Sequence, residues 1–459
     1  RIYPRKTMRL RKTITTIVAT AILLAGWQLF AVIANQPELI PSLPRLVRTL
    51  CEWLVSGSFY QSVGATILRG ILGMSISFVC AIGMAGLFAR FEWVYELFRP
   101  LLAIMRSIPV ISFILLALIF LNPESIPLMI AFLTMFPLLT ENLTRGILDL
   151  RPGLSIMARQ FHIKRSNVLF QIIYPQLKPF LYSGLASAAG FGWRAIIMGE
   201  VLSQCAFGIG SEMKRAQNFI AVPELLAWTI VAVFISFFFD KGISKVADIT
   251  PKISFANEDQ TIPTPTLSVL DTKDISYQYG IQHFSHSFQK GIIYGINAPS
   301  GKGKTTLLNL IGDILLPTEG EIHPTRHFGI ATIFQQPQLL PHLTAEENII
   351  LPLSSFLTEE KARRIAQKHL QEMEMEPFGN RYPKELSYGQ QQRIAIARAL
   401  AYPSPLLLMD EPFKGLDEAL SHRIIERIRE MQMKEERIIL FTSHNPDEIR
   451  LLADEVIYL

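Results

Sequence analysis

Six apolar segments fill most of the first half of the chain, and they limit its fold more than any other feature. They cover residues 13–34, 64–88, 101–121, 125–148, 180–202 and 220–239. About 20 apolar residues are enough to cross a bilayer as a helix. In lipid every backbone polar group must be satisfied within the segment, so we expect six transmembrane helices. A cleaved signal peptide does not account for residues 13–34, because that run is too long and more apolar segments follow it.

The basic residues indicate the orientation of these helices. Cytoplasmic loops of membrane proteins are enriched in Lys and Arg. Six such residues crowd the amino terminus: Arg1, Arg5, Lys6, Arg9, Arg11 and Lys12. An even number of crossings then returns the chain to the cytoplasm at Lys241, although Lys214 and Arg215 lie in an expected outer loop. We therefore expect a multi-pass protein of the cytoplasmic (inner) membrane that contacts lipid. Its net charge of +5 follows from topology and does not indicate nucleic-acid binding.

The three cysteines show no spacing typical of a metal site. They are Cys51, Cys80 and Cys205. The expected topology places Cys51 and Cys205 on the outer side, where they either form a disulfide or remain as unpaired thiols.

A phosphate-binding loop follows the apolar half of the chain. It comprises Ala298, Pro299, Ser300, Gly301, Lys302, Gly303, Lys304, Thr305 and Thr306. The pattern G-x-x-x-x-G-K-[ST] cradles nucleotide phosphates with backbone N–H groups, and here Ala298 replaces the first Gly. We expect Lys304 to reach the β- and γ-phosphates of ATP and Thr305 to bind Mg²⁺, while the helix from Thr306 directs its positive end at the anion. The alternative is a coincidental turn rich in Gly and Lys.

The composition changes again around this loop. Residues 250–266 are polar, contain three prolines and are expected to form an extended linker. From residue 267 onward, short strand-like runs alternate with helical patterns, which favours an α/β domain with a mainly parallel sheet. We expect an α-helical transmembrane domain at residues 1–249, a linker at 250–266 and an α/β P-loop ATPase domain at 267–459.

Two carboxylates follow a fully apolar run at residues 406–409. An apolar run of this kind is typical of a strand buried on both faces of a parallel sheet. Asp410 and Glu411 at its end suit an Asp that organises Mg²⁺ beside a Glu that activates water. The alternative, a charged strand end entering a loop, does not explain why the pair follows the phosphate loop in this order.

Residues 386–390, Leu-Ser-Tyr-Gly-Gln, resemble the signature motif of ATP-binding cassette (ABC) transporters, with Tyr388 in place of the usual first Gly. The resemblance implies that Ser387 and the backbone of Gly389 contact the γ-phosphate of ATP held by another cassette, and Gln390 completes the motif. The chain then belongs with ATP hydrolases coupled to transport, which use ATP and Mg²⁺.

Other positions resemble the motifs of that family in the expected order. Tyr279 resembles the aromatic residue that stacks on adenine, although a buried strand position is the alternative. Gln335 resembles the glutamine that touches Mg²⁺ and the attacking water, with the adjacent Gln336 as another register. Asp417 lies in a segment that resembles the loop joining two cassettes, and His444 resembles the histidine that contacts the γ-phosphate.

The family resemblance also implies a dimer. In such cassettes the phosphate loop and the signature face different ways, so a complete ATP site needs the signature of a second cassette. The chain carries one of each motif. The simplest assembly is a homodimer with two equivalent sites, both able to hydrolyse ATP because Glu411 is present.

The segment after residue 150 resembles the cytoplasmic coupling loop of bacterial importer permeases. Ala158, Ile172 and Pro175 match that pattern, whereas Ile156 replaces Glu and His162 replaces Gly. A basic amphipathic surface loop is the alternative. Residues 192–210 further resemble permeases of the nitrate, sulfonate and taurine class, which are usually separate from their ATPases.

This resemblance implies import of a small solute delivered by an extracytoplasmic binding protein. An ABC exporter and a cassette-gated regulatory or sensory protein are the alternatives; an exporter would have longer cytoplasmic helices than residues 89–100 allow. Charges within spans usually face a cavity or a partner. Arg194 and Glu200 are therefore expected either to line or gate the pathway or to form a structural pair.

Overall fold

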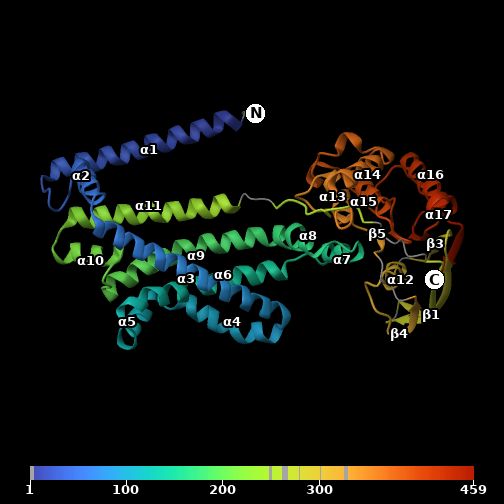
Figure 1. Ribbon diagram of the computed structural model, residues 1–459, viewed down its shortest axis with the longest axis horizontal. Coiled ribbons are helices and arrows are strands. Elements are labelled where there is room, and N and C mark those ends of the chain that lie inside the picture. The colour runs from blue at the N-terminus through green and yellow to red at the C-terminus, as the bar shows by residue number, and fades with distance from the viewer. Residues whose placement is uncertain (1–4, 248–250, 261–266, 279, 300, 325–328) are drawn as a thin grey trace. The chain divides into compact units, whose positions relative to one another are not determined.

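The computed structural model describes residues 5–247, 251–260, 267–278, 280–299, 301–324 and 329–459. The chain forms two compact units (Figure 1). We call Arg1–Asp149 with Leu177–Ile249 the membrane unit, and Leu150–Gln176 with Thr250–Leu459 the cassette unit. The two units meet in sequence at the expected boundary after residue 249. One earlier segment, residues 150–176, also belongs to the cassette unit.

The membrane unit is helical throughout its described part. Its helices are α1 (Arg5–Ala34), α2 (Leu43–Trp53), α3 (Gly57–Arg90), α4 (Glu92–Ser107), α5 (Val110–Phe120), the 3-10 turn η1 (Pro123–Ser125), α6 (Ile126–Leu148), α9 (Tyr174–Ser203), α10 (Ile209–Asn218) and α11 (Val222–Ala247). Five described helices are long and apolar enough to span a membrane, and the α4–α5 pair brings the number to six if it is one span. This confirms an expectation of about six spans.

The segment expected as a straight span at residues 101–121 is instead broken. Helices α4 and α5 are bent by 94° relative to each other. Proline restricts the residue before it to extended conformations and has no N–H to donate. Ile108 accordingly adopts ψ 130° before Pro109, and α4 ends at Ser107.

Small side chains let the central membrane helices approach closely. Helix α3 buries Gly70, Gly73, Ser77, Ala81 and Ala85. A Cβ at Gly73 would lie 2.6 Å from the Cβ of Ala131 on α6, so the two backbones approach too closely for a larger residue. Residues of α3, α6 and α9 share one core cluster, and α3 crosses α9 in the view of Figure 1.

The cassette unit contains two sheets. A three-stranded antiparallel sheet has the order β2-β1-β4, with β1 (Val269–Tyr277), β2 (Ile281–Gln289) and β4 (Glu319–His323). A five-stranded parallel sheet has the order β5-β6-β7-β3-β8, with β3 (Ile293–Asn297), β5 (Ala331–Ile333), β6 (Leu406–Asp410), β7 (Ile438–Thr442) and β8 (Glu455–Tyr458). Every residue of β6 and β7 is buried, which confirms the α/β class expected from the apolar runs.

Helices pack against the parallel sheet and share its hydrophobic core. They are α12 (Lys304–Ile311), α13 (Ala345–Leu353), α14 (Glu359–Glu372), α15 (Tyr388–Ala401), α16 (Glu418–Glu435) and α17 (Pro446–Leu452), with 3-10 turns η3 (Glu376–Phe378) and η4 (Pro383–Glu385). Figure 1 shows α13, α14 and α15 gathered on the side of the cassette unit away from β1 and β4.

Residues 150–176 pack into this cassette core. They form α7 (Pro152–Gln160), α8 (Arg165–Asn167) and the π-helical turn η2 (Val168–Ile173). Leu154, Met157 and Phe161 are buried in one cluster with apolar side chains of α13, α14 and α15. The burial comes from the apolar face of α7, whose spacing of three and four residues matches the helical period.

Candidate functional site

The phosphate loop joins β3 to α12 in a conformation that depends on glycine. Gly301 and Gly303 have φ of 82° and 90°, in the left-handed region that glycine adopts without strain. A Cβ on Gly303 would also lie 2.6 Å from the carbonyl oxygen of Gly280. Lys304 begins α12 and donates from Nζ to the carbonyl oxygen of Ala298 at 2.7 Å. The loop therefore presents the N-terminal N–H groups of α12 beside a buried ammonium. Ser300 lies outside the described residues.

Three residues expected at the metal line one cavity. Thr305 donates from its hydroxyl to Oδ2 of Asp410 at 2.9 Å, and Thr442 donates to Oδ1 of Asp410 at 2.8 Å. Thr305, Asp410 and Gln335 line a cavity of about 260 Å³. Hydroxyl, carboxylate and amide oxygens are the hard ligands that Mg²⁺ prefers, so this set of donors fits the ion.

Glu411 lies at the centre of a second group of contacts. Its Oε1 lies 3.0 Å from Nε2 of His444, and its Oε2 lies 3.1 Å from Nζ of Lys414. Burial raises the pKa of Glu411. Hydrogen bonds from Lys414 and Gln335, together with the charges of Lys414 and His444, outweigh this effect, so the pKa of Glu411 lies below its usual range. The carboxylate is therefore ionised at neutral pH and can accept a proton from water.

The signature residues cap a helix. Ser387 precedes α15 and accepts from the N–H of Gln390 at 3.3 Å, while the Gln390 side chain accepts from the N–H of Ser387 at 2.9 Å. This reciprocal pair is a capping box, which fixes the start of the helix. A Cβ on Gly389 would lie 2.5 Å from the carbonyl oxygen of Gly415, so glycine is required there.

Tyr388, the departure from the signature pattern, has a specific partner. Its hydroxyl donates to the backbone carbonyl of Gln335 at 2.8 Å. Because the Gln335 side chain hydrogen-bonds to Glu411, helix α15 is connected to the carboxylate of Glu411 through two bonds in the same chain.

The remaining sequence-predicted residues occupy separate places. Asp417 caps α16 by accepting from the N–H of Leu420 at 2.9 Å. Tyr279 lies outside the described residues. The structure therefore brings Thr305, Asp410 and Gln335 together around one cavity, and Gln335 also contacts Glu411, which pairs with His444.

Sequence reasoning missed three contributors: Thr442, Lys414 and the hydroxyl of Tyr388. Thr442 pairs in register with Asp410 on the neighbouring parallel strand, a relation that requires the strand order. Lys414 lies three residues after Glu411 in a turn closed by a bond from its N–H to the Glu411 carbonyl at 3.2 Å. That short spacing was the one available signal for Lys414.

The segment expected as a coupling loop makes polar contacts with the cassette through Gln160. The carbonyl of Gln160 accepts from the N–H of Ile330 at 2.7 Å, and its Oε1 accepts from the hydroxyl of Thr332 at 3.2 Å. Its Nε2 donates to the carbonyl of Gly312, which follows α12. Gly153 and Ile156 of α7 line the cavity that holds Thr305 and Asp410. The segment thus reaches the wall of the expected nucleotide site.

His162 occupies the place where the importer pattern has Gly. Its φ is 46°, in the left-handed region, where histidine is tolerated better than most side chains. The backbone bend that Gly would allow is therefore kept despite the substitution.

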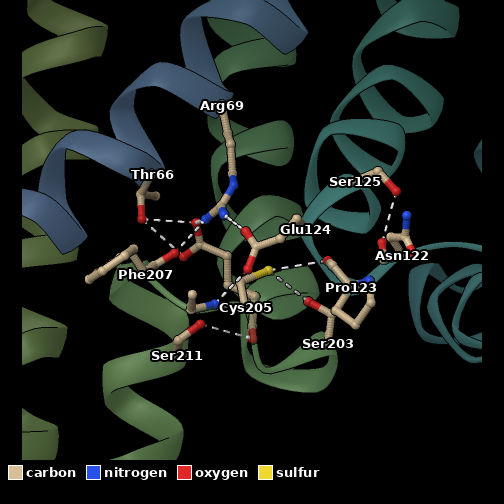
Figure 2. Close-up of polar contacts among 12 residues, drawn as sticks. Thr66, Arg69, Asn122, Pro123, Glu124, Ser125, Ser203, Cys205, Phe207 and Ser211 are labelled. Carbon is tan, nitrogen blue, oxygen red and sulfur yellow. Dashed lines mark hydrogen bonds and ion pairs between the residues drawn. The ribbon is translucent and has the colours of Figure 1, made fainter.

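The charges of the membrane unit form a cluster at Glu200, which is fully buried. Glu200 accepts from Nη1 of Arg69 at 2.7 Å, from the Thr66 hydroxyl at 2.9 Å and from the N–H of Gly210 at 2.9 Å. Arg69 also donates from Nη2 to Glu124 at 2.6 Å, and Figure 2 shows it between Thr66 and Glu124. Arg69 therefore ties α3 to η1 and α9, and Glu200 in turn ties α9 to the start of α10.

This arrangement corrects the idea of a structural pair between Arg194 and Glu200. Arg194 is exposed, and the cationic partner of Glu200 is Arg69. The six-residue separation within α9 turns the two side chains to different faces. Cys51 and Cys205 are both free, so of the two options for these residues the structure has unpaired thiols.

Comparisons with known proteins agree with both units. A family model described as a binding-protein-dependent transport system inner membrane component matches residues 63–240. A second model, described as an ABC transporter, matches residues 281–414.

Relatives match the cassette region. The ABC transporter ATP-binding protein MJ0796 of Methanocaldococcus jannaschii, itself uncharacterized, is 34% identical over 201 residues, which are 39% of this chain and 85% of that protein. The Fe(3+) ions import ATP-binding protein FbpC of Rhizobium etli is 35% identical over 39% of this chain and 54% of its own length. The glucose import ATP-binding protein GlcV of Saccharolobus solfataricus is 35% identical over 37% of this chain and 52% of its own length. The chain spans about half the length of these two import proteins.

Among solved structures, the chain is similar to a dimeric MJ0796 cassette in a post-hydrolysis state bound to ADP and Pi. The identity is 32%, over 41% of this chain and 94% of that chain, with a TM-score of 0.39.

Replacement of Arg69 by Met tests the buried cluster. The substitution leaves Glu200 without its cation, and breaking one side of a buried ion pair costs about 3–5 kcal/mol of unfolding free energy. Unfolding of the purified protein in detergent, followed by circular dichroism, should show this loss. The double variant Arg69→Met, Glu200→Gln should recover part of it. Equal stability of Arg69→Met and wild type would contradict the buried pair.

Replacement of Tyr388 by Phe tests the bond between the signature and Gln335. A hydrogen bond contributes about 0.5–1.5 kcal/mol, so we expect kcat for ATP hydrolysis to fall about two- to tenfold. The nucleotide dissociation constant should not change, because the phenol does not contact the phosphate loop. Tyr458→Phe, at an exposed position of β8, is the control. An unchanged kcat in Tyr388→Phe would show that the bond does not position Gln335.

Proposed function

The chain belongs to the ABC transporter family, and we propose that it imports a small solute across the cytoplasmic membrane. It has a permease region and an ABC ATPase domain in one multi-pass membrane protein. The ATPase domain binds ATP and is an ATP hydrolase coupled to transport. The observation that carries the import proposal is the match of residues 63–240 to the inner membrane component of binding-protein-dependent systems.

Two further observations support import. Cassette relatives include proteins described as import ATPases for iron and glucose. Helix α3 ends at Arg90 and α4 begins at Glu92, so the helix is broken within the short inner segment expected at residues 89–100, where an exporter would have longer cytoplasmic helices. In the proposed transporter a separate extracytoplasmic binding protein delivers the solute.

In the proposed ATPase reaction each group of residues has one task. The backbone of residues 298–306 and Lys304 hold the phosphates, and Tyr279 stacks on adenine. Thr305, Asp410 and Gln335 would hold Mg²⁺, which supplies charge neutralisation at the phosphates when bound. Glu411 takes the proton of the attacking water, and His444, 3.0 Å from Glu411, keeps that carboxylate oriented.

The proposed working unit is a homodimer. One chain carries one phosphate loop and one signature, and in this family the two belong to different ATP sites. Ser387, Gly389 and Gln390 of one copy then complete the site of the other, and the segment around Asp417 lies at the junction. The dipole of α15, fixed by the capping box, favours a phosphate at its N-terminus.

Coupling in this proposal runs through residues 150–176. Gly153 and Ile156 line the same cavity as Gln335, so a change in the position of Gln335 on ATP binding changes the surface that α7 rests on. Movement of the cassettes is thereby passed to α6 and α9, which continue from the two ends of the segment.

Replacement of Glu411 by Gln tests the catalytic assignment. Loss of a general base typically lowers a rate about 10²–10⁴-fold, so hydrolysis should nearly stop. ATP binding should persist, and the variant should accumulate an ATP-bound dimer detectable by size-exclusion chromatography with nucleotide analysis. Glu426→Gln, an exposed acid further along α16, should hydrolyse ATP normally. Normal turnover in Glu411→Gln would remove the role given to Glu411.

Reconstitution in vesicles tests the direction of transport. With the cassette facing outward, binding proteins of the nitrate, sulfonate and taurine class, charged with their solutes, should be added inside the vesicles. We expect one of them to stimulate ATP hydrolysis and release its solute to the cassette side. Stimulation by solute without a binding protein, with movement away from the cassette side, would identify an exporter. Hydrolysis without any solute movement would favour a regulatory protein.

A further inference from the structure

Residues 251–260 were expected to be an extended linker, and the structure shows that they are packed. Their burial alternates along the first part: Pro251, Ile253 and Phe255 are half-buried, whereas Lys252 and Ser254 are exposed. Ile253 and Phe255 pack against the core cluster of the cassette unit. A period of two is that of an extended chain with one face on a surface. We call residues 251–260 the strap.

The strap is bonded to the cassette along its length. The N–H of Ala256 donates to the carbonyl of Ser354 at 3.0 Å, and the N–H of Gln260 donates to the carbonyl of Phe356 at 2.8 Å. Asp259 accepts from the N–H and the hydroxyl of Thr358 at 2.9 and 3.0 Å. Since Thr358 is the N-cap of α14, the strap ends at the start of a cassette helix.

The strap is bonded equally to segment 150–176 through Asn167, which is 1% exposed. The Nδ2 of Asn167 donates to the carbonyl of Ser254 and its Oδ1 accepts from the N–H of Ser254, both at 2.8 Å. Nδ2 also donates to the hydroxyl of Ser354 on the cassette at 2.8 Å. A second amide, Gln171, donates to the carbonyl of Pro251 at 3.0 Å. One buried side chain thus joins the coupling segment, the strap and the cassette.

A flexible spacer would not need such contacts. A buried amide that lacked its partners could not replace them with water, so Asn167 favours the arrangement in which the strap covers it. A satisfied buried polar network also selects one geometry over others. The N–H of Lys164 also donates to the hydroxyl oxygen of Ser355 at 2.9 Å, which links residues 150–176 directly to the cassette beside the strap.

We propose that the strap fastens each coupling segment to the cassette of its own chain, with Asn167 as the positioning residue. The inference rests on the proposed coupling role of residues 150–176. In the dimer, each cassette then drives the membrane unit that precedes it in sequence and not the membrane unit of the other copy.

Disulfide cross-linking tests which cassette the segment contacts. In full-length protein with Cys51, Cys80 and Cys205 replaced by Ser, Lys164→Cys and Ser355→Cys should cross-link when both are in one chain. When two differently tagged copies carry one substitution each, covalent dimers should not form. Covalent dimers as the main product would overturn the proposal. The pattern does not depend on solute or direction, so it stands or fails separately from import.

Replacement of Asn167 by Ala tests the positioning role. We expect the rate of the 164–355 cross-link within one chain to fall at least about fivefold, because three hydrogen bonds of the Asn167 side chain are lost. Basal ATP hydrolysis should stay within about twofold of the wild-type rate. Stimulation of ATP hydrolysis through the membrane unit should be lost. Asn167→Asp keeps the acceptor and loses the donors, so it should give an intermediate rate.

Two matched variants complete the design. Ser166→Ala changes the neighbouring residue, whose buried hydroxyl has no hydrogen-bond partner in the described part of the chain, and it should behave as wild type. Asp259→Asn weakens the other end of the strap at an exposed position and should slow the cross-link in the same direction. Wild-type cross-linking in both Asn167→Ala and Asp259→Asn would refute the strap.

Discussion

The parallel pairing of β6, β7 and β3 is the constraint on which the cassette depends. Neighbouring parallel strands end at the same edge of a sheet, where ligands of open α/β sheets bind. The register places Thr442 beside Asp410 and Ile296 beside Thr442. The strand order alone therefore brings three segments together: the phosphate loop after β3, the carboxylates at the end of β6 and the residues after β7. Thr442 secures the meeting by holding Asp410 from the neighbouring strand at 2.8 Å.

Around this edge, two features make the site sensitive to distant parts of the unit. Gln335 follows β5, the strand next to β6, and is held by Tyr388 on one side while it holds Glu411 on the other. Gln160 is bonded to β5 and to the end of α12. A shift of α7 and a shift of α15 would both act on the same short strand region. The carboxylate of Glu411 is thus connected to α15 through Gln335, and it follows β6, the strand next to the one that Gln160 contacts.

The fold could be predicted from local sequence patterns, whereas most of the pairs of side chains that contact each other could not. Apolar length identified the spans, and buried runs such as 406–409 identified the parallel sheet, because each signal lies within one element. The break at Pro109 was readable from proline chemistry, yet the apolar run across it concealed the bend. The partner of Glu200 lies 131 residues away on another helix, and no periodicity connects it with Arg69. Asn167 and the strap likewise meet only in the folded chain, where an apparently polar linker uses its two apolar residues to pack.

The strap has a consequence for how transporters of this design are assembled. A separate ATPase chain reaches its permease by diffusion and can be shared among permeases according to their concentrations. A cassette held by a ten-residue strap, residues 251–260, is present beside its own coupling segment at an effective concentration that free subunits rarely match. Such a cassette is made in a fixed one-to-one ratio with its membrane unit, and another permease in the same membrane cannot compete for it by mass action. Because the two units are fused in this chain, the polypeptide itself fixes the ratio of cassette to membrane unit, which for separate subunits depends on their supply.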